Sequence, residues 1–182
     1  MKNFVTGCLL ATIAIFAWGA IFWMSPWPYS ALEQTLDDDA AGESLWENFP
    51  KTGTYIIPGI YNDEATHARL HNRGPIATIH IQRKGRAVME GSVFVFGFLH
   101  ELITVILIAL LMKMVLPALK FYRNRLGFVA FAGVAAAFFT NVGNPVWWYH
   151  PWGWYLFTGV YDVTAWVVVG LVLAKFIKPV SE

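Results

Sequence analysis

Four polar residues lie inside long apolar runs of this 182-residue sequence, and their side chains have the most capacity for chemistry. His100 and Glu101 lie in one run, Asn141 lies near the end of the next, and Asp162 lies in the last. A charge within a membrane-spanning helix costs about 2.5–3.5 kcal/mol, so such residues usually face one another or a cavity. Two carboxyl groups and an imidazole could relay protons, bind a cation or assist metal chemistry, or they could link helices by hydrogen bonds. A metal ion is not expected, because side chains adjacent in a helix point about 100° apart.

A second set of candidate ligands is predicted in a helix that Asn62 or Asp63 can cap. Glu64, His67 and His71 would share one face of that helix, a spacing that suits a transition metal. No further fixed ligand accompanies them, so we expect an ordinary surface helix, no metal and no cofactor.

The segment from Val142 to Trp154 is rich in aromatic residues, and its Asn144-Pro145 and His150-Pro151 pairs predict turns. Indole rings prefer the headgroup level of a bilayer, so this segment is expected to anchor the protein and to offer a docking surface. The alternative is that it stacks on an apolar cofactor or a lipid. The predicted interfacial aromatic loop comprises Trp147, Trp148, His150, Trp152 and Trp154.

Four membrane-spanning helices would position these residues. The chain is 57% hydrophobic and only 14% charged, whereas about a quarter of the residues in soluble domains are charged. Apolar runs at 4–24, 93–119, 126–142 and 155–177 have the length, about 20 residues, that crosses a bilayer. The predicted fold is an all-α integral membrane four-helix bundle, with a small α+β extracytoplasmic insert at 25–92 between helices 1 and 2. Residues 1–24 form the first helix, and 93–182 form the other three.

Basic residues predict the orientation of these helices. The insert exceeds about 60 residues, a length beyond which loop charges cease to govern topology. The basic residues near the helix ends lie on the same side as the two termini, and positive residues favour the cytoplasmic side. Both termini are therefore expected in the cytoplasm and the insert outside. Compactness and the lack of organelle signals favour a bacterial cytoplasmic membrane, with the insert in the periplasm. The residues that carry this argument are Lys2, Lys120, Arg123, Arg125, Lys175 and Lys178.

The insert is predicted to contain two short helices and a hairpin. Ser30 and Glu33 have capping-box spacing, which predicts a helix that ends at the acidic run 37–39. A strand is expected at 54–57, and a hairpin is expected to pair 76–81 with 87–89. The basic tip of that hairpin would contain Arg83, Lys84 and Arg86.

Function is less constrained than architecture. A single cysteine, Cys8, excludes an intramolecular disulfide, and a net charge of +1 argues against nucleic-acid binding. The sequence has no nucleophile elbow, P-loop, dinucleotide fingerprint or zinc-protease motif, so a familiar enzyme is not expected. The sequence favours a non-catalytic accessory subunit or assembly factor, whose partners are the lipid bilayer and other membrane subunits. The alternatives are a small membrane enzyme or a proton- or cation-coupled carrier that uses the polar cluster, and cofactor or lipid binding by the aromatic loop.

Overall fold

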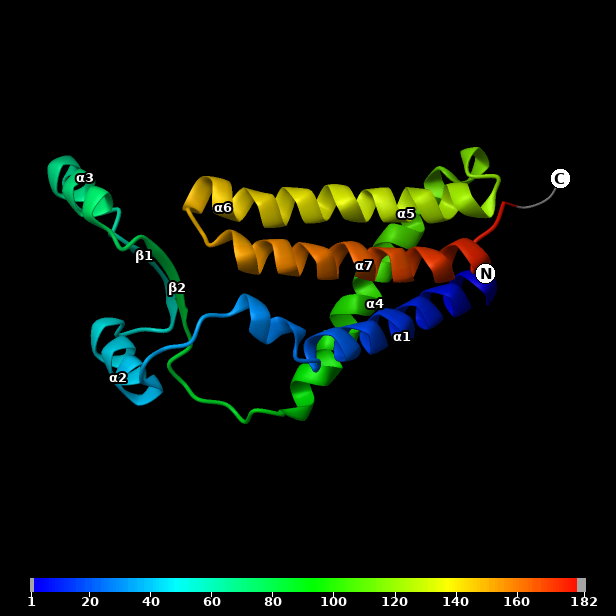
Figure 1. The fold of residues 1–182 in the computed structure, drawn as a ribbon. Coiled ribbons are helices and arrows are strands. Elements are labelled where there is room, and N and C mark those ends of the chain that lie inside the picture. Colours follow the sequence, from blue (N-terminus) through cyan, green and yellow to red (C-terminus); the bar gives the residue numbers. More distant parts are fainter. Residues whose placement is uncertain (1, 180–182) are drawn as a thin grey trace.

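The computed structural model describes residues 2–179, which form four long apolar helices and a two-stranded sheet (Figure 1). These helices confirm the four predicted runs, and each is long and apolar enough to cross a membrane. The first is α1 (Lys2–Trp23), the second is α4 (Gly91–Met114) and the last is α7 (Trp152–Phe176). The third is continuous through α5 (Tyr122–Ala137), the π-helical turn η3 (Phe138–Val142) and α6 (Gly143–Trp148).

The second helix is shorter than the predicted run 93–119. It ends at Met114, and the 3₁₀ turn η2 (Leu116–Ala118) follows. Pro117 lies in that turn, where its missing N–H and fixed φ are tolerated, whereas both would interrupt an α-helix.

The four helices form an open arrangement. Helix α7 packs along both α5 and α1, α4 packs along α1, and α4 and α5 approach each other only briefly. The start of α1 and the end of α7 lie at the same end of the helices, and α4 crosses the others obliquely (Figure 1). The main hydrophobic core is at that end, where all four helices contribute buried residues such as Ala11, Met112, Val129 and Leu173. All four helices therefore converge at one end, whereas α4 diverges from α5 toward the insert.

A face of small residues lets α5 approach α7 closely. Gly133 and Ala137 are buried on this face. A Cβ atom at Gly133 would overlap the Cβ and Cγ atoms of Trp166 in α7, so only glycine permits this separation of the two helices.

The predicted turn at Asn144-Pro145 is wrong, because Pro145 lies inside the third helix. Proline lacks the N–H that an α-helix needs, and its ring crowds the carbonyl group four residues earlier. The π-helical turn at Phe138–Val142 directly precedes this position and changes the hydrogen-bond spacing there. The chain instead turns at Tyr149, whose φ of 57° is left-handed, and at His150-Pro151 as predicted.

The insert contains the 3₁₀ turn η1 (Trp27–Ala31), two α-helices and a two-stranded antiparallel sheet. Helix α2 is Asp38–Asn48 and helix α3 is Glu64–Arg73. Strand β1 (Gly53–Ile57) pairs with β2 (Ala77–Ile81), with Gly53 opposite Ile81 and Ile57 opposite Ala77. Neither α2 nor α3 buries a side chain, so the insert has little core of its own.

The cap of α3 follows the sequence pattern. The carboxylate of Asp63 accepts a hydrogen bond from the backbone N–H of Thr66 at 3.0 Å. This bond holds the pKa of Asp63 below its ordinary value, because it stabilises the charged form. Of the two predicted caps, Asn62 and Asp63, Asp63 is therefore the one that caps α3.

Two predictions for the insert are wrong. Ser30 does not cap an α-helix, because it lies in the 3₁₀ turn η1. The run Asp37–Asp39 was expected to end a helix, but it begins helix α2. The Asp37 carboxylate accepts from the N–H of Ala40 at 3.1 Å, and acidic residues in a first turn also complement the helix dipole. The predicted hairpin is absent, since β2 pairs with β1 and Val88 is fully solvent-accessible. Pairing with β1 places Tyr55 opposite Ile79 and Ile56 opposite Thr78, cross-strand pairs of aromatic and β-branched residues that stabilise a sheet.

Candidate functional site

A polar cavity of about 280 Å³ lies between α4, α5 and α7, where α4 diverges from α5, and is called the polar groove below. It is lined by three of the four residues of the predicted cluster, namely His100 and Glu101 from α4 and Asp162 from α7. The other polar side chains of the groove are Thr104, Thr140 and Tyr161. The walls between them are apolar or aromatic, including Ile15 from α1 and Trp166 from α7.

Glu101 is the least satisfied polar group of the groove. Its Oε2 atom is buried and has no hydrogen-bond partner within residues 2–179. Leaving a buried acceptor unpaired costs about 1–3 kcal/mol, and more when the group is charged. On α1, Gly19 leaves room for this carboxyl group, because a Cβ atom there would lie 3.8 Å from Glu101 Oε1 and 3.1 Å from the Tyr161 hydroxyl. Tyr161 and Glu101 therefore approach the same point of α1.

Asp162 differs from Glu101 because a chain of side-chain hydrogen bonds holds it. Asn141 Nδ2 donates to Asp162 Oδ2 at 2.8 Å, and Thr158 Oγ1 donates to Asn141 Oδ1 at 2.7 Å. Asn141 lies in the π-helical turn and also donates to the Ala137 carbonyl group at 3.0 Å. Asn141, the fourth residue of the predicted cluster, thus contacts Asp162 but does not line the groove itself.

His100 is exposed at the groove, next to Glu101 in α4. Its backbone carbonyl group accepts a hydrogen bond from Thr104 at 3.0 Å, so Thr104 is held one turn further along the same helix. An exposed imidazole and a half-buried carboxyl group in one cavity are groups that can exchange a proton or bind a small cation.

Tyr161 and Thr140 are members of the groove that the sequence interpretation missed. Tyr161 directly precedes Asp162, and a phenolic hydroxyl group in the middle of an apolar run needs a polar partner or water. That signal could have identified Tyr161. Thr140 carried no comparable signal, because its side chain also donates to the Ala136 carbonyl group at 3.0 Å, as threonine commonly does inside a helix.

Glu64, His67 and His71 do not form a metal centre. Within residues 2–179, no three His, Cys, Asp or Glu side chains are arranged to hold a metal ion. His67 Nδ1 lies 3.3 Å from the Gly59 carbonyl oxygen, and the His71 ring packs edge-on against Tyr149 at 5.7 Å. The histidines therefore help to hold α3 on its own loop and on the turn between α6 and α7.

The predicted aromatic loop is shorter than expected, because only Tyr149, His150 and Pro151 lie between α6 and α7. His150 Nδ1 and the Tyr155 hydroxyl are 2.7 Å apart, and the two rings stack. The tryptophans lie on helix ends, with Trp147 and Trp148 exposed on α6 and Trp152 and Trp154 in the first turn of α7. They form a band at one end of the helices rather than a loop.

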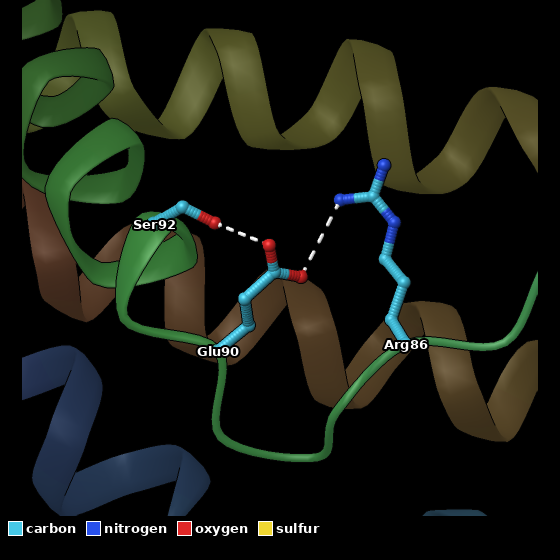
Figure 2. A network of polar contacts seen from close by, with 3 residues as sticks. All are labelled: Arg86, Glu90 and Ser92. Atoms are coloured by element: carbon cyan, nitrogen blue, oxygen red, sulfur yellow. Dashed lines mark hydrogen bonds and ion pairs between the residues drawn. The ribbon is translucent and has the colours of Figure 1, made fainter.

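The basic segment 83–86 is not a hairpin tip. The Arg83 guanidinium group lies 3.5 Å from the centre of the Trp46 ring and donates to the carbonyl groups of Trp46 and Phe49. Arg83 therefore fastens α2 to the sheet. Arg86 pairs with Glu90 at 3.7 Å, and Ser92 donates to the other oxygen of Glu90 at 2.9 Å (Figure 2). Glu90 is thus a paired carboxylate before the same helix that carries the unpaired Glu101.

No family model, curated protein or solved structure matches this chain.

Proposed function

We propose that this chain is a polytopic membrane protein that binds protons or a small cation in the polar groove. The observation that carries the proposal is the buried, unpaired Glu101 carboxyl oxygen in a cavity shared with His100 and Asp162. An apolar residue at position 101 would pack without this cost, so folding alone gives no reason for a carboxyl group there. Ionisable groups in spanning helices commonly mark ion pathways or proton relays.

The proposal includes a location. The four apolar helices would cross a bacterial cytoplasmic membrane, with both termini in the cytoplasm and the insert in the periplasm. Basic residues at the end of the helices where α1 begins support this orientation through the positive-inside rule. The tryptophans at the opposite end support the placement of these helices across a bilayer, because indole rings prefer the headgroup level.

The two carboxyl groups would have different roles. Asp162 is held by Asn141 and would provide a fixed negative charge or ligand. Glu101 Oε2 has no hydrogen-bond partner within residues 2–179, so Glu101 is the group that would take up and release the proton or cation. His100 would connect it with the surface, and the hydroxyl groups of Thr104 and Tyr161 could complete an oxygen-lined site.

Carbodiimide labelling tests this proposal. An apolar carbodiimide partitions into the bilayer and modifies carboxyl groups that it can reach there. We expect peptide mapping of the purified protein to show Glu101 modified at least about ten times faster than Glu90, which is outside the apolar run and paired with Arg86. The variant Glu101→Gln identifies the adduct, and Glu90→Gln is its matched control.

The ligand is identified by what protects Glu101 from carbodiimide labelling. Protection by Na⁺ or Mg²⁺ at constant pH, lost in Asp162→Asn, would identify a cation. A labelling rate that follows pH and ignores added cations would identify the proton. An unreactive Glu101, or one labelled no faster than Glu90, would contradict the proposal.

A second candidate function is an accessory subunit or assembly factor, without catalysis of its own. The specific observation in its favour is that α4 and α5 diverge, so the groove opens sideways, where a helix of a neighbouring membrane protein could enter. The insert, whose helices bury no side chain, would gain a core from the same partner.

Mild detergent extraction from native membranes distinguishes this second function. We expect one membrane protein to co-purify in a constant ratio, because burial of Glu101 against a polar group of the partner would stabilise the complex. Introducing a bulky residue at the groove, as in Thr140→Trp, should release the partner, while Ala135→Trp, at an exposed position of α5 outside the groove, should not. Recovery of the parent chain only as a monomer would contradict this function.

A further inference from the structure

A second cavity, of about 860 Å³, lies at the opposite end of the helices from the insert and is called the basic pocket below. Four of its lining side chains are basic, namely Lys113, Lys120, Arg125 and Lys178. They come from the end of α4, the connection to α5, the start of α5 and the residues after α7. The fold therefore gathers charges that are up to 65 positions apart into one cavity, because Lys113 and Lys178 both line it.

Arg125 is held rigidly in this pocket. Its side chain is 4% exposed, Nε donates to the Ala174 carbonyl group at 3.0 Å, and Nη1 donates to those of Leu119 and Lys120 at 3.0 and 2.8 Å. No hydrogen bond within residues 2–179 uses Nη2, so that group remains for a further acceptor. A guanidinium group fixed in this way loses little entropy when it binds an anion.

The positive charges are not neutralised by carboxylates of the described chain. The acidic residues nearest in sequence along α4 and α7 are Glu101 and Asp162. Glu101 is 13 residues before Met114, the end of α4. At 1.5 Å per residue, that separation is about 20 Å, well beyond contact. Oxygen-rich anions, above all phosphates, are the natural ligands of such an arrangement of Arg and Lys.

We propose that the basic pocket binds the phosphate group of an anionic phospholipid. In the orientation proposed above, the pocket lies at the cytoplasmic headgroup level, where basic pockets between helices bind acidic headgroups. Leu116 and Pro117 form an apolar part of its wall, against which the glycerol and upper acyl chains can pack. The inference rests on the proposed membrane location but is independent of chemistry in the polar groove.

Native mass spectrometry of the full chain in detergent tests the inference, with phosphatidylglycerol and phosphatidylcholine as probes. We expect the double variant Lys120→Gln and Lys178→Gln to weaken phosphatidylglycerol binding at least about tenfold, because both side chains line the pocket. The matched control is Arg123→Gln with Lys175→Gln, which removes the same two charges from the same end but outside the pocket. That control should change the affinity less than about twofold.

The outcomes separate the explanations. Equal loss in both double variants, or equal binding of phosphatidylcholine, would overturn the proposal in favour of general surface charge. Competition by millimolar inorganic phosphate would support the phosphate site and point to a soluble source, whereas resistance to it supports the lipid. Carbodiimide labelling of Glu101, measured on the same variants, should remain at the parent rate, so failure here is distinguishable from failure of the polar groove.

Discussion

Replacing Arg125 with methionine should lower the thermal unfolding midpoint of the detergent-solubilised protein by about 10 °C. The substitution removes three hydrogen bonds at once and leaves the carbonyl groups of Leu119, Lys120 and Ala174 without their donor. Only the bond to Ala174 is buried, where an unpaired acceptor costs about 1–3 kcal/mol, and the two part-buried bonds contribute about 0.5–1.5 kcal/mol each, so about 3 kcal/mol is expected in total. For a chain of this size, each kcal/mol corresponds to about 2–4 °C.

Two further variants separate hydrogen bonding from charge at this position. Arg125→Lys retains the positive charge but not the planar group that reaches several carbonyls, so its midpoint should remain well below that of the parent. Arg123→Met removes an exposed charge two residues away and should change the midpoint by no more than about 2 °C. A parent-like midpoint for Arg125→Met would show that this guanidinium group does not fasten α5 to α7.

Gly133→Ala should be the most damaging single-methyl addition in the four helices. The new Cβ atom would overlap Trp166, so α5 and α7 must separate or the indole ring must leave its place. Overpacking of this kind costs about 1–3 kcal/mol, which corresponds to a midpoint lower by about 2–12 °C. The Asn141–Asp162 hydrogen bond lies further along the same two helices and should weaken as they separate.

Gly127→Ala is a matched control in the same helix. A Cβ atom at Gly127 would meet nothing within 4 Å, and alanine favours a helix over glycine by about 1 kcal/mol. Its midpoint should therefore equal or exceed that of the parent. If circular-dichroism melts gave the two alanine variants the same midpoint, close packing at Gly133 would not be important for the fold.

Local features of the fold were predictable where the cause is local. An apolar run of sufficient length forms a helix whatever its neighbours are, so α1 and α7 followed from composition. Asp63 was predictable as a cap because the capping bond joins it to Thr66, three residues away. The same reasoning failed at Asp37–Asp39, because an acidic run is compatible with a linker as well as with the first turn of a helix.

Pairings between distant segments were not predictable. Residues 76–81 have strand character, but pairing with β1 rather than with 87–89 depends on which segment the loops bring alongside. The π-helical turn that accompanies Pro145 in the third helix has no simple sequence signature either. It matters for the candidate site, because Asn141 lies in that turn and reaches Asp162 from it.

The sequence by itself determined that ionisable residues lie within apolar helices, where the cost of an isolated charge predicts that they face one another or a cavity. Only the tertiary structure decided that Asn141 holds Asp162 while Glu101 has no hydrogen-bond partner among the described residues. It also decided that Arg125 and three lysines line one pocket. The physical reason is that hydrophobicity acts residue by residue along the chain, whereas hydrogen bonds and cavities depend on the separation and tilt of helices, which the packing of residues such as Gly133 sets.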